Sequence, residues 1–502
     1  MRYALTAAMA KETDRVTIEE IGVPSVVLME RAAEAVALKT AEIAALFNRG
    51  VRVLAVCGCG NNGADAIAAA RILSWQGMSV DIAVVGNEEH STEEYVLQKS
   101  IAIKSGMAVV NINELPEYDI VIDGILGIGL KGAVREEYEE IIRLINNTRN
   151  IVVSVDVPSG VDATTGTVAT EAVKADVTVT FGYIKTGLLQ YPGKLYAGEI
   201  TVTDIGFYPE AVKSMNPPMY FIPESIQGIP SRKKDANKGT YGRLLVIAGS
   251  EDMSGAAYLS GAAALRSGAG LVEIVTHDRN AELIRKMLPE AIVSGYNEDN
   301  ATDVIGSKLN KSTCIILGPG LSQSDTAKDI VDYVLNNAEI PVIIDADALN
   351  IVSKDISVLK RYPSAVIITP HIGEMTRLTG MSAEAIKSDR MKVASEFAQN
   401  NNSIVVMKDA VTVVAENNSG NRMYINTSGT PAMAKAGLGD VLTGVIAGMY
   451  MLGIEPYSAA AMGTYIHGMA GELAAYEMGE HSVIATDVVD CISKVLNTNK
   501  GS

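Results

Sequence analysis

Twice along this chain, short apolar segments alternate with longer segments of helical period, and this alternation limits the possible folds more than any other feature. In the first half we expect strands over 51–57, 80–85, 107–112, 119–123, 151–155 and 176–181. We expect helices over 3–20, 25–47, 63–76, 92–105 and 136–147. Near-continuous apolar strands between helices are typical of a doubly wound parallel sheet. The first half is therefore predicted to be an α/β domain of this kind.

A second alternation begins near residue 240. Its expected strands are 243–248, 271–275, 313–317, 341–345, 365–369, 404–407 and 411–415, and its expected helices are 255–267, 279–287, 325–336, 383–399, 440–452 and 457–478. Residues 209–239 are rich in proline and show no periodicity, which marks a boundary. A chain of 502 residues is also too long for one ordinary core. We therefore expect two α/β domains, 1–208 and 240–502, joined by a linker at 209–239.

The charge balance excludes several classes of partner. The net charge of −17 disfavours nucleic acid and anionic membranes as partners. No apolar run has the length of a membrane span, and the N-terminus has no signal-peptide pattern. The four cysteines have neither the spacing of a disulfide framework nor that of a zinc site. These features predict a cytoplasmic protein whose anionic ligands are held locally.

Polar residues follow three predicted strands of the first half. They are Asn61, Asn62 and Asp65 after the first strand, Asp123 at the end of another, and Asp156 with Ser159 after a third. Ligands of doubly wound sheets bind beyond the carboxyl ends of strands, so we expect these groups to share one site. Asn and Asp oxygens suit a hard cation or sugar hydroxyls, and the glycine-rich loop 124–132 suits a phosphate. Ordinary turn and cap chemistry is the alternative interpretation.

The second half contains a glycine-rich run, Asn426 to Gly444, in which Asp440 precedes an apolar helical pattern. Glycines let backbone N–H groups approach an anion, and the helix start favours one. An Asp at such a site is expected to take a proton from a hydroxyl during phosphoryl transfer, although a simple N-cap is the alternative. His371 and Lys408 also follow predicted strands; a structural histidine and a surface ion pair are their alternative interpretations.

Three motifs of the first half, NNGADA (61–66), DGILGIGLKG (123–132) and SVDVPSGVD (154–162), resemble the N-terminal domain of bifunctional NAD(P)H-hydrate repair enzymes. The resemblance implies a Rossmann-like epimerase that interconverts the R and S forms of NADHX and NADPHX. An acid/base group would help the C6 hydroxyl to leave and water to return, and we expect Asp156 to be that group. It implies a potassium ion bound by Asn62, Asp123 and Ser159. Ala64 and Ala66 replace glycines of the usual motif, which is tolerable if both positions are helical. The implied substrate-binding residues are Asn61, Asn62, Gly63, Ala64, Asp65, Gly127, Ile128, Gly129, Leu130, Lys131, Gly132, Ala133, Tyr138 and Asp156.

Five motifs of the second half resemble the ribokinase-like NAD(P)H-hydrate dehydratases: GPGL (318–321), DADALN (345–350), TPHIGE (369–374), KDAVT (408–412) and the 426–444 run. The resemblance implies dehydration of the S form with ADP and Mg²⁺, Asp440 as catalytic residue, and a homo-oligomer of four or more chains. Ala348 and Ala436 replace glycines of the usual motifs. Substrate would contact Gly320, His371 and Asp440. The implied nucleotide-binding residues are Lys408, Asp409, Ala410, Val411, Thr412, Gly429, Thr430, Met433, Gly437 and Gly439.

Two other functions fit the same residues. A small-molecule kinase fused to a Rossmann-like domain would use the same fold and Asp440, but it would release a stable phosphorylated product instead of free phosphate. The first half could also be a binding or scaffold module without turnover, in which case it would show no cation-dependent epimerisation.

Overall fold

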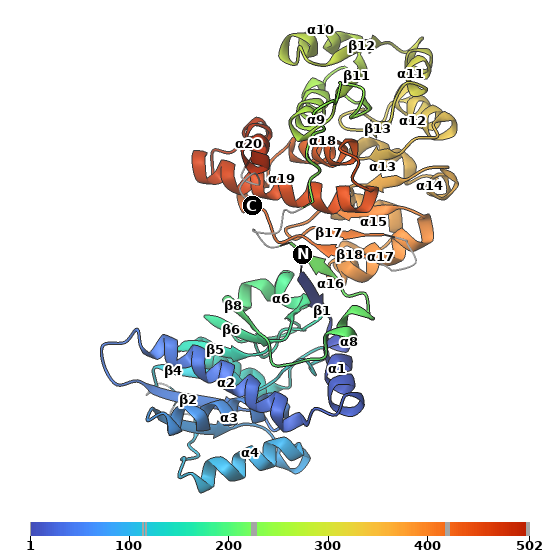
Figure 1. Cartoon of the computed structure of the whole chain (residues 1–502). Coiled ribbons are helices and arrows are strands. Elements are labelled where there is room, and N and C mark those ends of the chain that lie inside the picture. Colours follow the sequence, from blue (N-terminus) through green and yellow to red (C-terminus); the bar gives the residue numbers. More distant parts are fainter. Residues whose placement is uncertain (1, 113–114, 116–117, 222–227, 417–421, 498–502) are drawn as a thin grey trace. The chain divides into compact units, whose positions relative to one another are not determined.

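The computed structural model describes residues 2–112, 115, 118–221, 228–416 and 422–497 (Figure 1). The chain divides into two compact units: Tyr3–Pro218, and a second that contains Arg2 and the residues from Met219 onward. The division lies within the predicted linker 209–239, of which residues 222–227 lie outside the described residues. Helix α8 (Pro209–Lys213) of that segment belongs to the first unit, so the chain remains ordered there beyond residue 208.

The first unit contains a six-stranded parallel sheet with the order β3-β2-β4-β5-β6-β8. The strand order reverses between β2 and β4, and a doubly wound sheet binds ligands in the crevice at such a reversal. The strands are β2 (Arg52–Cys57), β3 (Ser79–Val84), β4 (Ile120–Gly124), β5 (Ile151–Val155), β6 (Val177–Phe181) and β8 (Glu199–Thr203).

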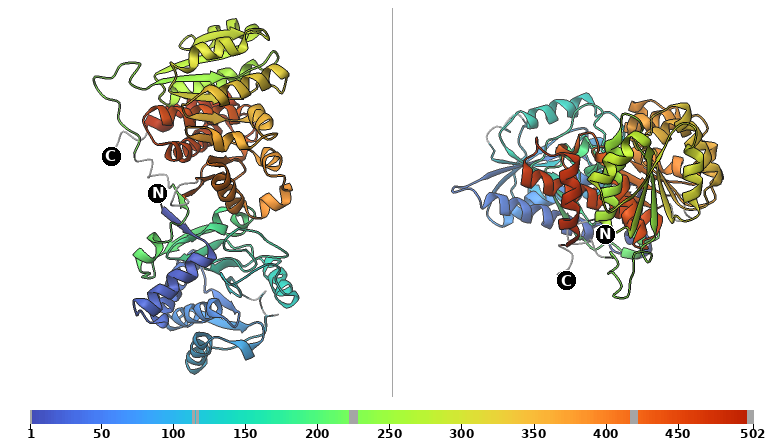
Figure 2. Two further views of the ribbon diagram at one scale, coloured as in Figure 1. Left: turned by 90° about the vertical axis from the view of Figure 1, so that its right-hand side faces the viewer. Right: turned by 90° about the horizontal axis from the view of Figure 1, so that it is seen from above.

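Helices cover both faces of this sheet because its central strands are mostly apolar and their side chains alternate between the two faces. On β2, Val53 and Ala55 belong to the core beneath α2 and α3, whereas Leu54 and Val56 pack with α5 on the opposite face. Figure 2 shows the helices in these two layers. The helices are α2 (Ser25–Ala44), α3 (Asn61–Trp75), α4 (Glu93–Lys104) and α5 (Glu136–Asn146).

Three expectations for local structure were wrong. The predicted helix 3–20 begins instead with strand β1 (Arg2–Leu5), which pairs in parallel with β7 (Ile184–Lys185) and is followed by α1 (Ala7–Arg15) and a short π-helix. The predicted strand 107–112 is reduced to one isolated bridge. The predicted helix 383–399 is two helices, α16 (Ala383–Ser388) and α17 (Arg390–Asn401). In the first case a distant partner strand outweighs local helical propensity.

The sheet of the second unit has the order β12-β11-β10-β13-β14-β15-β16-β17-β18-β9. It is parallel from β12 to β16, whereas β17 is antiparallel to both of its neighbours. The bounds are β10 (Arg243–Ile247), β11 (Leu271–His277), β12 (Ile292–Tyr296), β13 (Cys314–Leu317), β14 (Val342–Ile344), β15 (Val366–Ile368), β16 (Ile404–Met407), β17 (Val413–Ala415), β18 (Met423–Ile425) and β9 (Met219–Tyr220).

Helix α18 (Leu438–Met451) packs tightly between α9 (Ser254–Ser267) and α19 (Pro456–Met478). Glycines make this possible: a Cβ at Gly444 would lie 2.4 Å from the Ser260 carbonyl oxygen. The packing fixes the position of the helix start that carries Asp440. The other helices are α10 (Asp278–Met287), α11 (Ala301–Leu309), α12 (Asp325–Asn337), α13 (Ala346–Val352), α14 (Ser357–Arg361), α15 (Ile372–Thr379) and α20 (Ala485–Asn497).

No helix in the described part of the chain has both the length and the apolar character that a membrane crossing requires.

Candidate active sites

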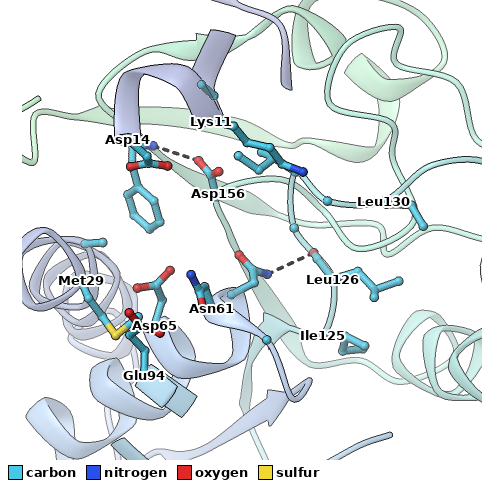
Figure 3. Close-up of a pocket in the computed structure, with 18 of the residues that line it drawn as sticks. Lys11, Asp14, Met29, Asn61, Asp65, Glu94, Ile125, Leu126, Leu130 and Asp156 are labelled. Atoms are coloured by element: carbon cyan, nitrogen blue, oxygen red, sulfur yellow. Dashed lines mark hydrogen bonds between the residues drawn. The ribbon is translucent and has the colours of Figure 1, made fainter. Parts of the chain in front are cut away.

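A cavity of 740 Å³ opens at the carboxyl ends of β2 and β4 in the first unit (Figure 3). The loops that follow these two strands form part of its wall, so the cavity lies at the point where the strand order reverses. Gly63, Ala64 and Gly132 are not among the lining residues. The predicted substrate-binding residues that line the cavity are Asn61, Asn62, Asp65, Gly127, Ile128, Gly129, Leu130, Lys131, Ala133, Tyr138 and Asp156.

Helix α3 begins at Asn61, so Ala64 and Ala66 are both helical and have negative φ. Both methyl groups are buried and neither position needs the conformational freedom of glycine. Gly63 is different, because a Cβ there would lie 1.8 Å from the Gly58 carbonyl oxygen. This glycine therefore allows the loop after β2 to pack on the start of α3.

Asp156 lies directly after β5 with a φ of 65°, an uncommon conformation for a residue with a side chain. Its Oδ1 accepts hydrogen bonds from Lys185 Nζ at 2.5 Å, Thr180 Oγ1 at 3.0 Å and the Phe181 backbone N–H at 3.1 Å. Lys185, which our sequence reasoning missed, lies on β7 and also lines the cavity. A lone lysine in the apolar segment GYIKTGLL is the only signal that could have indicated it.

Two further carboxyl groups, Asp14 and Asp65, line the same cavity. In Figure 3 Asp14 is drawn beside Asp156, and Asp65 is drawn below them beside Asn61. Burial is the main cause that raises the pKa of Asp14 to about 6, with Lys185 lowering it and Asp156 raising it. Burial, followed by the charge of Asp156, raises the pKa of Asp65 well above its usual range. The cavity therefore holds two carboxyl groups that take up a proton more readily than exposed carboxyl groups do. Asp14 belongs to α1, a segment from which no site residue was predicted.

The three residues predicted to bind potassium meet at the turn after β4. Asp123 is fully buried, and its Oδ1 accepts a hydrogen bond of 2.6 Å from Ser159 Oγ. Ser159 Oγ also accepts from the Leu126 backbone N–H at 2.8 Å, and Asn62 Nδ2 donates to the Leu126 carbonyl at 3.1 Å. Burial raises the pKa of Asp123, although its hydrogen bonds with Ser159 and Ser154 oppose this shift.

This set of donors fits a hard monovalent cation. The carboxylate of Asp123, the hydroxyl of Ser159, the side-chain carbonyl of Asn62 and the backbone carbonyl of Leu126 are all oxygen ligands. Asp123 has no cationic side chain among its hydrogen-bond partners in the described residues, so a bound cation would compensate a buried carboxylate.

In the second unit, Asp345 lies at the end of β14 and is almost completely buried. Its Oδ1 accepts hydrogen bonds from Lys408 Nζ at 2.7 Å and from Thr369 Oγ1 at 2.7 Å. A Cβ on Gly439 would lie 3.3 Å from Lys408 Nζ and 3.7 Å from Asp345 Oδ2, so the glycine-rich turn lies against this ion pair. The ends of three strands and the start of α18 therefore meet at one point.

Asp440 lies in the first turn of α18 beside this ion pair. Burial, together with the negative charge of Asp345, raises its pKa to about 7, and Lys408 opposes the shift. Burial also raises the pKa of Glu374 to about 7. The pKa of Lys408 is raised: burial alone would lower it, but Asp345, Glu374 and Asp440 outweigh that effect.

His371 forms the N-cap of α15. Its Nδ1 accepts hydrogen bonds from the Gly373 and Glu374 backbone N–H groups at 2.9 and 3.3 Å, and Glu374 Oε2 accepts from the His371 N–H at 2.7 Å. Burial and the charge of Lys408 lower the pKa of His371. His371 therefore has a structural role as a cap, and its Nε2 lies 3.6 Å from Glu374 Oε1.

The residues predicted to bind nucleotide occupy two segments. The first segment follows β16 and includes Ala410, Val411 and Thr412. In it, Asp409 forms an ion pair of 2.8 Å with Arg390, a partner that the sequence did not indicate. In the second, the Gly429 N–H donates to Glu472 Oε1 at 2.7 Å, and Thr430 caps a 3-10 turn that includes Met433.

Several glycines of this unit adopt positive φ. Gly437 (φ 88°) and Gly320 (φ 59°) do so, and a Cβ on Gly320 would lie 2.9 Å from Ala256 Cβ at the start of α9. Ala348 and Ala436, which replace glycines of the usual motifs, have negative φ. His467, another residue that we missed, is buried and interacts with the Leu438 backbone at the start of α18.

Comparison with known proteins gives matches in both halves. The family profile described as "YjeF-related protein N-terminus" matches residues 25–187, and the profile described as "NAD(P)H-hydrate dehydratase" matches residues 244–494. The chain is 35% identical to the bifunctional NAD(P)H-hydrate repair enzyme of Moorella thermoacetica, over 98% of this chain and 96% of that one. The bifunctional NAD(P)H-hydrate repair enzyme of Escherichia coli is 33% identical, over 88% and 85% of the two chains.

Among solved structures, a ribokinase-like superfamily protein from Enterococcus faecalis is 28% identical with a TM-score of 0.50. The match covers 56% of this chain and 95% of that one. The fold of the second half is therefore ribokinase-like.

Proposed function

Because the chain belongs to the family of bifunctional NAD(P)H-hydrate repair enzymes, we propose that its first half interconverts R- and S-NAD(P)HX and that its second half dehydrates the S form to NAD(P)H. The observation that carries the first activity is the cavity at the strand-order reversal, with Asp156 in its wall. The two activities are proposed for residues 1–208 and 240–502, joined by 209–239.

The epimerase reaction needs a group that gives a proton and takes it back. Loss of the C6 hydroxyl as water consumes one proton and leaves an iminium between C6 and the ring nitrogen. Addition of water to the opposite face releases that proton and gives the other epimer. We propose Asp156 as the acid/base. The raised pKa values of Asp14 and Asp65 support this proposal, because these two carboxyl groups take up a proton more readily than usual in the same cavity as Asp156.

A potassium ion is proposed at Asn62, Asp123 and Ser159. When bound, it would compensate the charge of Asp123 and hold the turn after β4 against α3, since Asn62 and Ser159 both contact Leu126. With the turn held in this way, the loop 127–133 would face the substrate. The hydrogen bonds between these groups support the proposal.

In the dehydratase half we propose that Asp440 takes the proton of the C6 hydroxyl as a phosphoryl group is transferred to that oxygen. Phosphate then leaves C6 with its bonding electrons, the C5 proton is lost, and the ring double bond is restored. The glycines before α18 would supply N–H donors to the phosphoryl oxygens. Lys408 is held by Asp345 at the site, while Gly320 and His371 are proposed to face the substrate.

The phosphoryl donor is proposed to be ADP, which would leave as AMP, with Mg²⁺ as the cation. Mg²⁺ in such sites is held by one or two carboxylates together with substrate phosphates. The carboxylates that interact electrostatically with Asp440 are Asp345 and Asp347, and they fit this role. We propose a cytoplasmic homo-oligomer of four or more chains.

The experiment that tests the function follows the absorbance of reduced nicotinamide on mixed R/S-NADHX with Mg²⁺ and either ADP or ATP. Complete recovery of NADH with ADP is the expected result. Recovery of only the S fraction would contradict the epimerase assignment and favour a binding module in the first half. A stable phosphorylated product without NADH would instead indicate a small-molecule kinase.

A further inference from the structure

We infer that Lys185 is a positioning residue of the epimerase, which holds Asp156 so that a single carboxylate oxygen, Oδ2, faces the substrate. The inference rests on the epimerase function proposed above. It concerns a residue outside the three motifs on which the site was predicted.

The ammonium group of Lys185 is buried, and all of its N–H donors have acceptors. The residue is only 3% exposed, and its three N–H donors have three acceptors: Asp156 Oδ1 at 2.5 Å, the Phe181 carbonyl at 3.0 Å and Thr180 Oγ1 at 3.2 Å. A buried charge is retained when it is paired and hydrogen-bonded in this way. Lys185 therefore has no donor left for a ligand, and its effect on the reaction must pass through Asp156.

The two oxygens of Asp156 have different environments. Oδ1 accepts three hydrogen bonds, from Lys185, Thr180 and the Phe181 N–H, whereas Oδ2 accepts none from the described residues. Asp156 is 8% exposed and lines the cavity (Figure 3). Because the side chain is held through Oδ1 and the backbone has a φ of 65°, Oδ2 is the oxygen left for the C6 hydroxyl.

The position of Lys185 is fixed by the N-terminal strand. Leu5 of β1 is the ladder partner of Lys185, and helix α1, which follows β1, places Asp14 in the cavity wall. The charged groups that act on the Lys185–Asp156 pair are Asp14 from α1 and Asp65 from α3. The segment before residue 25, which the matched family profile does not include, thus completes this site.

The test uses the full chain with mixed R/S-NADHX, Mg²⁺ and ADP, in which the S fraction gives a fast phase and epimerisation of the R fraction a slow phase. The variants are Lys185→Met, which keeps the length of the side chain but removes the charge, Lys185→Arg, and Thr180→Val, which removes one donor to Oδ1. Lys174→Met is the matched control, because Lys174 is exposed and does not line the cavity. The fast phase and a thermal melt of each variant report folding.

We expect Lys185→Met to lower kcat of the slow phase by about tenfold or more, with a much smaller change in KM. Lys185 lowers the pKa of Asp14 in the same cavity, so loss of its charge should raise that pKa and move the acid limb of the pH profile of epimerisation to higher pH. Lys185→Arg should recover part of the rate, Thr180→Val should lose less than Lys185→Met, and Lys174→Met should lose nothing.

A wild-type rate of epimerisation in Lys185→Met would overturn the inference. Equal losses of this rate in the Met and Arg variants, with an unchanged pH profile, would also overturn it. If Lys185→Met does not fold, the inference is tested on Lys185→Arg and Thr180→Val. A wild-type rate of epimerisation and a wild-type pH profile in both variants would overturn it. Failure of the wild-type chain to show any slow phase would instead contradict the proposed epimerase function.

Discussion

The ammonium of Lys408 donates a 2.7 Å hydrogen bond to Oδ1 of Asp345, and the two residues come from the ends of different strands, β16 and β14. Lys408 was predicted to bind nucleotide, but its nearest ionic partner within the protein is a buried carboxylate. The pair holds a positive and a negative charge next to Gly439 and the start of α18, where phosphoryl transfer is proposed.

Removal of Lys408 should destabilise the second unit. In Lys408→Met, Asp345 stays buried without its cation, and we expect a loss of about 3 kcal/mol in the free energy of unfolding. Urea denaturation of the full chain would measure this in the transition of the second half. The double variant Lys408→Met/Asp345→Asn should regain most of the lost stability but no dehydratase activity. Lys392→Met, at an exposed lysine on α17, is the control, and a similar loss there would contradict the explanation.

Asp440→Asn should slow dehydration strongly and leave epimerisation intact. A general base typically contributes about 10²- to 10⁴-fold to the rate, so a loss in this range is expected. Because the pKa of Asp440 is raised to about 7 and the base must be ionised, kcat/KM of the wild-type chain should fall as the pH drops below 7. Formation of NADH from S-NADHX between pH 5.5 and 9 measures both effects.

Glu374 is the necessary control for that pH profile, since burial raises its pKa to about 7 as well. If the acid limb persists in Glu374→Gln, it belongs to Asp440. Its disappearance in this variant would show that Glu374 carries the titration. Asp303→Asn, at an exposed position of α11, should change nothing.

Asp14→Asn should stabilise the first unit at neutral pH. The pKa of Asp14 is raised from 3.8 to about 6 in the folded state, so the folded protein holds this proton more tightly than the unfolded chain does. The stability that results is complete below pH 3.8 and is lost as the pH rises through 6. At pH 7.5 the variant should therefore be about 1 to 3 kcal/mol more stable than the wild type, with no difference near pH 4.

Urea denaturation at the two pH values tests this prediction, with Glu34→Gln at an exposed position as the control. A stabilisation of equal size at both pH values would contradict the explanation by titration.

Epimerisation should depend on potassium through Asp123 and Ser159. We expect the rate to fall when potassium is replaced by a bulky organic cation, and we expect Asp123→Asn and Ser159→Ala to lose this dependence. Ser154→Ala is the matched control: it removes a 2.8 Å hydrogen bond to Asp123 Oδ2 but none of the proposed cation ligands. Titration of the slow phase with KCl measures the effect, and an identical response in all four chains would exclude the site.

The two α/β units, their central strands and the polar residues at the strand ends could be predicted from the sequence, because apolar periodicity and strand-end motifs are local properties. Asn62, Asp123 and Ser159 lie together for this reason: carboxyl ends of neighbouring parallel strands meet at one edge of a sheet.

Tertiary structure decided the rest. Arg2–Leu5 forms a strand because β7 provides a partner 180 residues away, in a register that sets Leu5 opposite Lys185. Lys185, Asp14 and Arg390 belong to no motif, and only the packing of distant elements brings them to Asp156 or Asp409. The sequence by itself determined which strand ends carry the chemistry, whereas burial and long-range pairing, which no local pattern encodes, decided the ionic partners and pKa values of those groups.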